Sequence, residues 1–283
     1  MELWLIRHGQ TADNHLKILA GHQPGKLSEL GVTQAKKTGV KLAKYKFHEI
    51  YCSDLGRAKE TLENILISHP SKDKMKVNYS ELLREKGAGV LEGQPLIVWK
   101  NGAEKAGLGI RKYKAENGES WEDVMARADK FVEELIEKYI TSKNQPQSHQ
   151  EEEKNNMNIV NTSTGKAKFE ETKLDLIGGI SGQSIKPIGG SKTTPAPKTS
   201  DKKSLPKIMV VTHGGWIMEF FNVINFRKSG QKPIFLNNTS NCSINVVRIS
   251  ESSTTLGKKN ITYDIVNRND VTHLSAGPGS KLH

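Results

Sequence analysis

The sequence predicts an α/β fold, a three-layer sandwich in which helices flank a mostly parallel central sheet. Three observations lead to this prediction. Short apolar runs that are typical of strands recur along the chain. Amphipathic stretches of helical period lie between them, and strand–helix alternation is the pattern of α/β proteins. No internal repeat is visible, which leaves one core domain interrupted by a long loop.

The first predicted strand is the apolar run ELWLI at Glu2–Ile6, which leads directly into Arg7-His8-Gly9. A polar loop follows. Ser28 then has the position of an N-cap, and it predicts a helix over about 31–44. The lysines of this helix are expected to form a solvated face rather than a binding patch.

The next segment repeats the alternation. EIYC at Glu49–Cys52 predicts the second strand, and a helix over about 55–68 follows it. Ser53 or Asp54 is expected to cap that helix, because both side chains accept hydrogen bonds from helix N-termini. MKVNY at Met75–Tyr79 predicts a third, weaker strand.

A glycine-rich loop over Leu83–Gly93 separates this strand from a strongly amphipathic helix. Ser120 opens the helix, predicted over 121–139, and Asp123 completes a capping-box pattern with it. Apolar residues that recur at helical spacing are expected to form its buried face: Val124, Ala128, Phe131, Leu135 and Tyr139.

The stretch 142–206 differs from the rest of the chain. Only 13 of its 65 residues are hydrophobic, and it holds five of the ten prolines. Burying so little apolar surface would not offset the conformational entropy that the segment loses on folding. We therefore expect a long flexible insertion. The predicted organisation is one domain over 1–141 and 207–270, with a flexible tail at 271–283.

Order is expected to resume directly after the insertion. KIMVVTH at Lys207–His213 predicts a buried strand, and a helix over about 215–225 follows it. Two late strands, over about 243–249 and 261–266, complete the predicted core.

Composition excludes several classes of protein. No run of about 18 apolar residues exists, so no membrane insertion is expected. Two cysteines, Cys52 and Cys242, do not make a disulfide framework and indicate a reducing compartment. The net charge of +11 favours an anionic partner. Aromatic residues make up only 6% and do not interleave with lysines and arginines, which argues against a platform that stacks single-stranded nucleic acid. No nucleic acid partner is expected, and nucleic acid binding stays a minor alternative.

Two histidines stand out because each follows an apolar strand and precedes a glycine. They are His8 in RHG and His213 in THGG. Ligands of open α/β sheets collect at the carboxyl ends of the strands, so both imidazoles are expected to share one pocket. Arg7 adjoins His8, Arg57 opens the helix after the second strand, and Glu85 lies in the loop after the third.

These side chains suit phosphoryl transfer. Arginine forks match phosphoryl oxygens and keep their charge. A neutral imidazole attacks phosphorus, a second imidazole stabilises the developing charge, and a carboxylic acid protonates the leaving oxygen. No metal and no cofactor is required, and the sequence contains no dense carboxylate cluster or HExxH string.

Six segments, in order, resemble the histidine phosphatase superfamily, the phosphoglycerate mutase-like group. They are LIRHGQTADN, LSELGVTQA, CSDLGRAKET, LREKGAGVLEG, GES at Gly118–Ser120 and VVTHGG. The long polar insertion and NNTSNCSINVV are most similar to the fructose-2,6-bisphosphatases of that family. Two positions depart from the family's pattern: Gln10 stands where an acid is usual, and His22 where a glutamine is often found.

The resemblance implies roles for the residues that match. His8 is the phosphohistidine nucleophile, Glu85 the proton donor and acceptor, and Arg7, Arg57 and His213 complete the phosphate pocket. The expected substrate-binding residues are Asn14, Gly21, His22 and Gly214.

The resemblance also implies the substrate and the setting. The expected substrate is a small anionic phosphorylated sugar, fructose 2,6-bisphosphate, with fructose 1,6-bisphosphate and 2,3-bisphosphoglycerate as further substrates. Hydrolysis would lower glycolytic flux and favour the pentose phosphate pathway. The implied location is the cytoplasm, with the nucleus and mitochondrion as further sites; no protein partner is indicated.

Two alternatives stay open at this point. A phosphoglycerate mutase would use the same five residues and return the phosphoryl group to a monophosphoglycerate. A non-enzymatic interaction scaffold would use the insertion, although an intact set of five site residues argues against a degenerate site.

Overall fold

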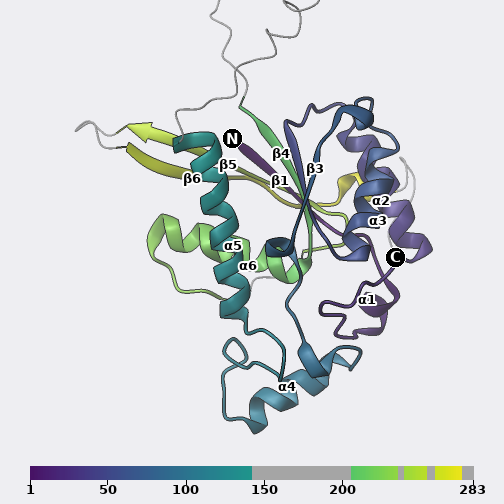
Figure 1. Cartoon of the computed structure of the whole chain (residues 1–283), viewed down its shortest axis with the longest axis vertical. Coiled ribbons are helices and arrows are strands. Elements are labelled where there is room, and N and C mark those ends of the chain that lie inside the picture. Colours follow the sequence, from purple (N-terminus) through teal and green to yellow (C-terminus); the bar gives the residue numbers. More distant parts are fainter. Residues whose placement is uncertain (142–204, 235–238, 254–258, 276–283) are drawn as a thin grey trace, which may run out of the picture. The chain divides into compact units, whose positions relative to one another are not determined.

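A computed structural model describes residues 1–141, 205–234, 239–253 and 259–275, and Figure 1 shows their arrangement. The predicted insertion at 142–206 lies outside the described residues except for its last two, and so does the tail from residue 276. The division into a domain, an insertion and a tail therefore stays a prediction. Residues 271–275, at the start of the predicted tail, include a 3-10 turn at Thr272–Leu274, where Leu274 accepts a hydrogen bond from Lys37 Nζ.

A six-stranded sheet with the order β3-β2-β4-β1-β5-β6 forms the centre of the fold. The neighbours β3–β2, β2–β4 and β4–β1 are parallel, whereas β1–β5 and β5–β6 are antiparallel. The strands are β1 (Glu2–Arg7), β2 (Glu49–Ser53), β3 (Val77–Ser80), β4 (Lys207–Thr212), β5 (Ile244–Ser253) and β6 (Lys259–Asp270). The predicted α/β fold with a mostly parallel sheet is confirmed.

Helices cover both faces of the sheet, which gives the three predicted layers (Figure 1). The described helices are α1 (Ala12–Leu16), α2 (Glu29–Leu42), α3 (Gly56–Leu66), α4 (Leu96–Lys105), α5 (Trp121–Ile136) and α6 (Gly214–Ser229). The pair α2 and α3 packs on one face, and the pair α5 and α6 packs on the other. α4 stands apart from both layers, beyond the carboxyl ends of the parallel strands (Figure 1).

The middle of β1, Leu3–Ile6, is apolar because it is buried on both faces. Leu3 and Leu5 belong to the core beneath α5 and α6, whereas Trp4 and Ile6 belong to the core beneath α2 and α3. Successive side chains of a strand point to opposite faces, so four consecutive apolar residues serve two cores. Each buried side chain contributes about 1.5–3 kcal/mol to stability. The burial of these four residues holds β1 in its register and so places Arg7 and His8 at its carboxyl end.

The α2–α3 contact depends on a glycine. A Cβ on Gly39 would lie 2.4 Å from the carbonyl oxygen of Ile65, so only glycine permits this approach of the two helices. α3 carries Arg57 in its first turn. The close packing of α3 on α2 therefore helps to fix the position of Arg57 relative to the sheet.

Two of the predicted helix caps are confirmed. Ser28 accepts a hydrogen bond from the backbone of Gly31, and Ser120 forms a capping box with Asp123. α5 ends at Ile136, three residues earlier than predicted, and a π-helical turn follows it over Glu137–Thr141. The predicted buried face of α5 is confirmed for Val124, Ala128, Phe131 and Leu135, whereas Tyr139 is partly buried.

The predicted cap of α3 is wrong. Its N-cap is Leu55, and no side chain caps the helix. Ser53 instead forms a hydrogen bond with a histidine of the site, and Asp54 forms an ion pair with Arg84. Both polar side chains thus bind residues that are distant in sequence. Cap prediction considers only neighbouring residues, so it does not detect such competing partners.

α1 and α4 were not predicted. α1 has five residues, too few for a periodic pattern. Its N-terminus is fixed by a capping box between Thr11 and Asn14. α4 exposes large apolar side chains such as Ile97, which is 57% exposed, so its sequence lacks an obvious polar face.

Candidate active site

A cavity of about 600 Å³ opens at the carboxyl end of β1. Its wall includes the loop that follows β1, the loop after β3, the N-terminus of α6 and the segment around α4. Four cationic side chains and one carboxylate line it: Arg7, Arg57, Lys86, Lys100 and Glu85. A cavity with this charge is suited to a small polyanion.

His8 lies at this cavity and is 2% exposed. Its Nδ1 donates a hydrogen bond to the carbonyl oxygen of Gly9 at 2.7 Å. Because a carbonyl oxygen only accepts, Nδ1 carries the proton, and Nε2 of the neutral ring keeps its lone pair. Burial, followed by the charges of Arg57 and Arg7, holds the pKa of His8 well below its usual range. The ring is therefore neutral at physiological pH, with a lone pair on Nε2.

His213, the N-cap of α6, is completely buried beside His8. The two ring centroids lie 5.1 Å apart, although the residues are 205 positions apart in sequence. His213 Nε2 lies 2.8 Å from the hydroxyl of Ser53, whereas its buried Nδ1 has no hydrogen-bond partner among the described residues. Buried polar atoms usually have partners, so a bound oxyanion is a natural one for Nδ1.

Arg7, at the end of β1, and Arg57, in the first turn of α3, both line the cavity. Arg57 is 1% exposed and donates to the carbonyl oxygens of Gln23 at 2.7 Å and Gly21 at 2.9 Å. Arg7 donates through Nη1 to the carbonyl oxygen of Thr239, and its buried Nε has no hydrogen-bond partner in the part of the chain that the structure describes. The free Nε–H is positioned to bind an anion.

The carboxylate of Glu85 is held against the N-terminus of α6. Its Oε2 accepts from the backbone N–H of Gly215 at 3.0 Å, and its Oε1 accepts from the backbone N–H of Lys86 at 2.9 Å. A Cβ on Gly215 would lie 2.2 Å from Oε1. The two glycines after His213 thus allow close approach, because a Cβ on Gly214 would lie 3.1 Å from the Arg7 guanidinium.

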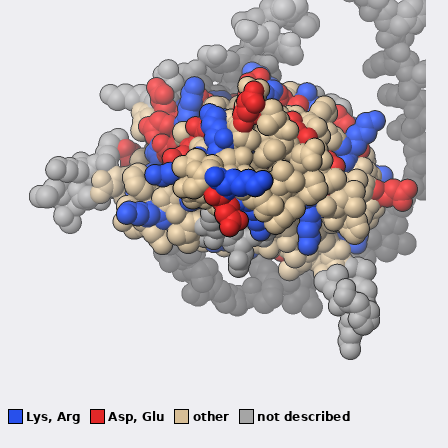
Figure 2. Space-filling view, turned by 90° about the horizontal axis from the view of Figure 1, so that it is seen from below, with Lys and Arg blue, Asp and Glu red and all other residues tan. Residues whose placement is uncertain are grey.

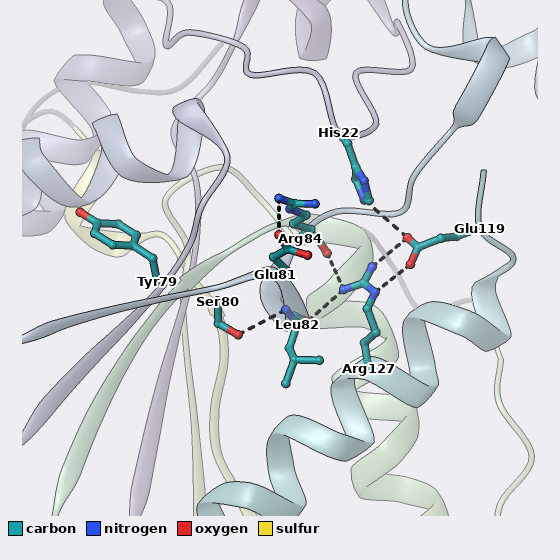
Figure 3. A pocket seen from close by; sticks show the side chains of 8 residues that line it. All are labelled: His22, Tyr79, Ser80, Glu81, Leu82, Arg84, Glu119 and Arg127. Carbon is teal, nitrogen blue, oxygen red and sulfur yellow. Dashed lines mark hydrogen bonds and ion pairs between the residues drawn. The ribbon is translucent and has the colours of Figure 1, made fainter. Parts of the chain in front are cut away.

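The structure brings the five predicted catalytic residues together; their roles remain a proposal. Three of the four predicted substrate-binding residues, Asn14, Gly21 and Gly214, also line the cavity. His22 does not line it among the described residues. Its side chain lies in a neighbouring pocket of about 470 Å³, shown in Figure 3.

Sequence reasoning missed several lining residues. Lys86 is 8% exposed, and its Nζ lies 5.2 Å above the Trp99 ring and 5.8 Å above the Trp121 ring. Burial lowers its pKa. Lys86 adjoins Glu85, so the sequence offered a signal, whereas Trp99 and Lys100 belong to α4, which was not predicted.

Figure 2 shows the face of the molecule at the α4 end. Lysines and arginines there are interspersed with acidic side chains, and wide areas carry neither. Positive charge on this face is therefore not gathered into one continuous basic surface. Among the described residues, no helix combines the length and apolarity needed to cross a bilayer.

Curated relatives share the chain's sequence at moderate identity. Fructose-2,6-bisphosphatase TIGAR of Xenopus tropicalis is 28% identical over 96% of this chain and 94% of that protein. Fructose-2,6-bisphosphatase TIGAR of Bos taurus is 33% identical over 53% of this chain and 56% of that protein. The predicted similarity to this group of relatives is confirmed.

Solved structures support the fold. A phosphoglycerate mutase from Bacillus anthracis has a TM-score of 0.58 at 18% identity and covers 97% of this chain and 95% of its own. A phosphoserine phosphatase from Entamoeba histolytica has a TM-score of 0.55 at 16% identity and covers 97% of this chain and 99% of its own. At these identities the likeness concerns the fold alone.

A family model matches residues 3–149, which span β1, β2, β3 and the loop that carries Glu85. Together with the curated relatives, it confirms the predicted class of enzyme, a phosphatase. From this match and the geometry of the cavity, the chain belongs to the histidine phosphatase superfamily, branch 1.

Proposed function

We propose that this chain is a metal-independent phosphatase that hydrolyses fructose 2,6-bisphosphate through a phosphohistidine formed on His8. One observation carries the proposal. His8 is a buried, neutral imidazole whose Nε2 keeps its lone pair, and it lies in a cavity lined by four cationic side chains. This combination matches a nucleophile that receives a phosphoryl group from a polyanion.

The first step transfers the phosphoryl group to the enzyme. Nε2 of His8 attacks phosphorus, and the bond between phosphorus and the sugar oxygen breaks. Arg7, Arg57 and His213 stabilise the charge on the phosphoryl oxygens, because Arg7 Nε and His213 Nδ1 lie buried and no described residue accepts a hydrogen bond from them. Glu85 protonates the departing sugar oxygen.

The second step regenerates the enzyme. Glu85, now a carboxylate, takes a proton from water, and the oxygen of that water attacks phosphorus. The bond between phosphorus and Nε2 breaks, which releases inorganic phosphate and returns Glu85 to its acid form. The N–H groups of Lys86 and Gly215 hold the carboxyl group of Glu85 in one place, as the acid before the first step and as the carboxylate between the two steps.

A bisphosphate is proposed because the cavity is larger and more cationic than one phosphoryl group requires. Lys86 and Lys100 line it in addition to the two arginines. Relatives named fructose-2,6-bisphosphatase support the 2-phosphate of fructose 2,6-bisphosphate as the first choice. Fructose 1,6-bisphosphate and 2,3-bisphosphoglycerate are proposed as further substrates.

The cellular part of the proposal rests on resemblance alone. Removing fructose 2,6-bisphosphate would lower glycolytic flux and favour the pentose phosphate pathway. We place the activity in the cytoplasm, with the nucleus and the mitochondrion as further compartments.

The test compares the full chain with its His8→Ala variant on a panel of sugar and glycerate bisphosphates. The parent chain is expected to release phosphate and to carry an acid-labile phosphoryl group on His8, detected by mass spectrometry. The variant should do neither while it keeps its thermal unfolding temperature. His15→Ala, which changes an exposed histidine of α1, is the matched control.

Two results would change the proposal. Undiminished phosphate release by His8→Ala would remove His8 as the nucleophile. Interconversion of 3-phosphoglycerate and 2-phosphoglycerate that is faster than phosphate release would favour the mutase.

A further inference from the structure

The loop Leu82–Gly87, which carries Glu85, is built around the side chain of Arg127. Arg127 Nη1 donates to the carbonyl oxygens of Leu82 at 2.9 Å and Arg84 at 3.0 Å, and Nη2 donates to that of Glu85 at 3.3 Å. Figure 3 shows the guanidinium of Arg127 directed at this loop from α5. Three backbone carbonyls at and before Glu85 are thus tied to one side chain.

Glu119 completes this arrangement from the other side. Its two oxygens accept from Arg127 Nε at 2.8 Å and Nη2 at 2.9 Å, and Oε2 also accepts from the backbone N–H of Gly87 at 2.8 Å. All five N–H groups of the guanidinium are therefore used. Burial raises the pKa of Glu119, but the nearby His22 ring and the hydrogen bonds from Arg127 and Gly87 outweigh it and lower the pKa to about 2.

His22 joins the same cluster from the loop between α1 and α2. Its Nε2 donates to the carbonyl oxygen of Glu85 at 2.8 Å and lies 3.6 Å from Glu119 Oε2. The residues on either side of His22, Gly21 and Gln23, accept hydrogen bonds from Arg57. The cluster therefore connects the loop held by Arg57 to the loop that carries Glu85.

We infer that Arg127 and Glu119 are positioning residues, whose bidentate ion pair holds the backbone of Leu82–Gly87 so that the Glu85 carboxylate stays at the catalytic cavity. The inference rests on the proposed role of Glu85 as the acid and base of the reaction. Neither Arg127 nor Glu119 lines that cavity among the described residues, so both act through Glu85. His22 is assigned to the same network rather than to the substrate.

The physical reason is the sensitivity of proton transfer to distance. A displacement of about 1 Å at the reacting groups lowers a rate by about 10²-fold. In Glu119→Gln, an NH2 group replaces one carboxylate oxygen. Arg127 loses an acceptor at Nε if Oε1 is replaced, and both Arg127 Nη2 and Gly87 lose one if Oε2 is replaced. The loop keeps its sequence and its other contacts but loses part of what fixes Glu85.

The experiment measures single-turnover cleavage of fructose 2,6-bisphosphate by the full chain and three variants. These are Glu119→Gln, Arg127→Lys and, as the control, Glu133→Gln. Glu133 also lies on α5 and pairs with an arginine, Arg227, but it does not contact the loop Leu82–Gly87. Thermal unfolding of each variant shows whether it is folded.

Two readouts distinguish positioning from a general structural role. Glu119→Gln and Arg127→Lys should cleave the bisphosphate about tenfold or more slowly, because the sugar oxygen needs a proton to leave. On 4-nitrophenyl phosphate, both should release 4-nitrophenolate in the first turnover at a rate within about threefold of the parent's rate. The reason is that 4-nitrophenolate leaves without being protonated. Glu133→Gln should match the parent on both substrates.

A double-mutant cycle with Glu85→Gln tests whether Glu119 acts through Glu85. If Glu119 acts through Glu85, adding Glu119→Gln to the Glu85→Gln variant should slow the bisphosphate reaction by less than about twofold. A further loss as large as the one seen in the parent would overturn the inference, and so would equal losses on both substrates. A parent chain that forms no phosphohistidine would instead overturn the proposed function and the inference with it.

Discussion

Substitution of Gly215 by alanine tests whether the position of Glu85 controls the reaction. Gly215 is the second residue of α6, and its N–H donates to Glu85 Oε2 at 3.0 Å. The added Cβ would lie 2.2 Å from Glu85 Oε1 and 2.8 Å from two ring carbons of Trp121. Since an ordinary contact begins at 3.4 Å, the carboxylate oxygen must move by about 1.2 Å.

A displacement of this size is enough to slow the reaction strongly. Misplacement by about 1 Å lowers a rate by about 10²-fold, which corresponds to about 2.7 kcal/mol in the barrier. Stability should change much less, because alanine is favoured over glycine in a helix by about 1 kcal/mol, which offsets part of the strain against Trp121. We therefore expect kcat/KM for fructose 2,6-bisphosphate to fall by about two orders of magnitude in a folded protein.

The assay measures phosphate release together with thermal unfolding. Gly109→Ala is the matched control, since a Cβ there would meet no atom within 4 Å and the backbone φ is not positive. Gly109→Ala should keep the parent's kcat/KM. If Gly215→Ala keeps kcat/KM within about threefold of the parent, Glu85 does not act from the place where the structure holds it.

Two further predictions concern stability. The pKa of His8 is held below its usual value of 6.5, first by burial and then by arginine charges, so the unfolded chain binds a proton near pH 6.5 that the folded chain does not. The free energy of unfolding should therefore fall as pH drops below 6.5, and His8→Asn should make the slope shallower by about 1.4 kcal/mol per pH unit in urea titrations. Arg111→Met should destabilise the fold by about 3 kcal/mol, because it removes the bidentate partner, at 2.6 and 2.8 Å, of the fully buried Glu219 carboxylate; the double variant with Glu219→Leu should regain much of that loss.

The order of elements was predictable because its signals are local. The apolar run at Glu2–Ile6 and the capping box of Ser120 and Asp123 are written in adjacent residues, and both predictions are confirmed. The sheet order was not predicted, because β4 lies between β1 and β2 only through pairing across nearly the whole chain. No local pattern specifies such a partner.

In the site, too, features set by local sequence were predictable, whereas those set by tertiary contacts were not. His8 and His213 were predicted to lie together because each directly follows a strand, and parallel strands place their carboxyl ends at one edge of the sheet. His22 was expected at the substrate because of the family resemblance, yet its side chain lies against Glu119 and the backbone of Glu85. A loop's location was predictable, whereas the direction of one side chain depended on tertiary contacts.

Ser53 offers a test that separates sequence reasoning from the structure. As a helix cap, its loss would reduce the stability of α3 by about 1 kcal/mol and leave catalysis unchanged. In the structure its hydroxyl oxygen accepts weakly from Leu55 N at 3.3 Å and lies 2.8 Å from His213 Nε2. A hydroxyl that already accepts is free to donate, which favours the tautomer of His213 with its proton on Nδ1, the atom that has no partner within the described ranges of the chain.

Ser53→Ala should therefore affect catalysis more than the helix. Loss of a hydrogen bond worth about 1 kcal/mol predicts a fall of about fivefold in kcat/KM for fructose 2,6-bisphosphate. The fall should disappear when Ser53→Ala is added to His213→Ala, because the hydroxyl then has no imidazole to orient. An unchanged rate together with a lower unfolding temperature would show that Ser53 acts on α3 after all, and that the bond to His213 does not contribute to the reaction.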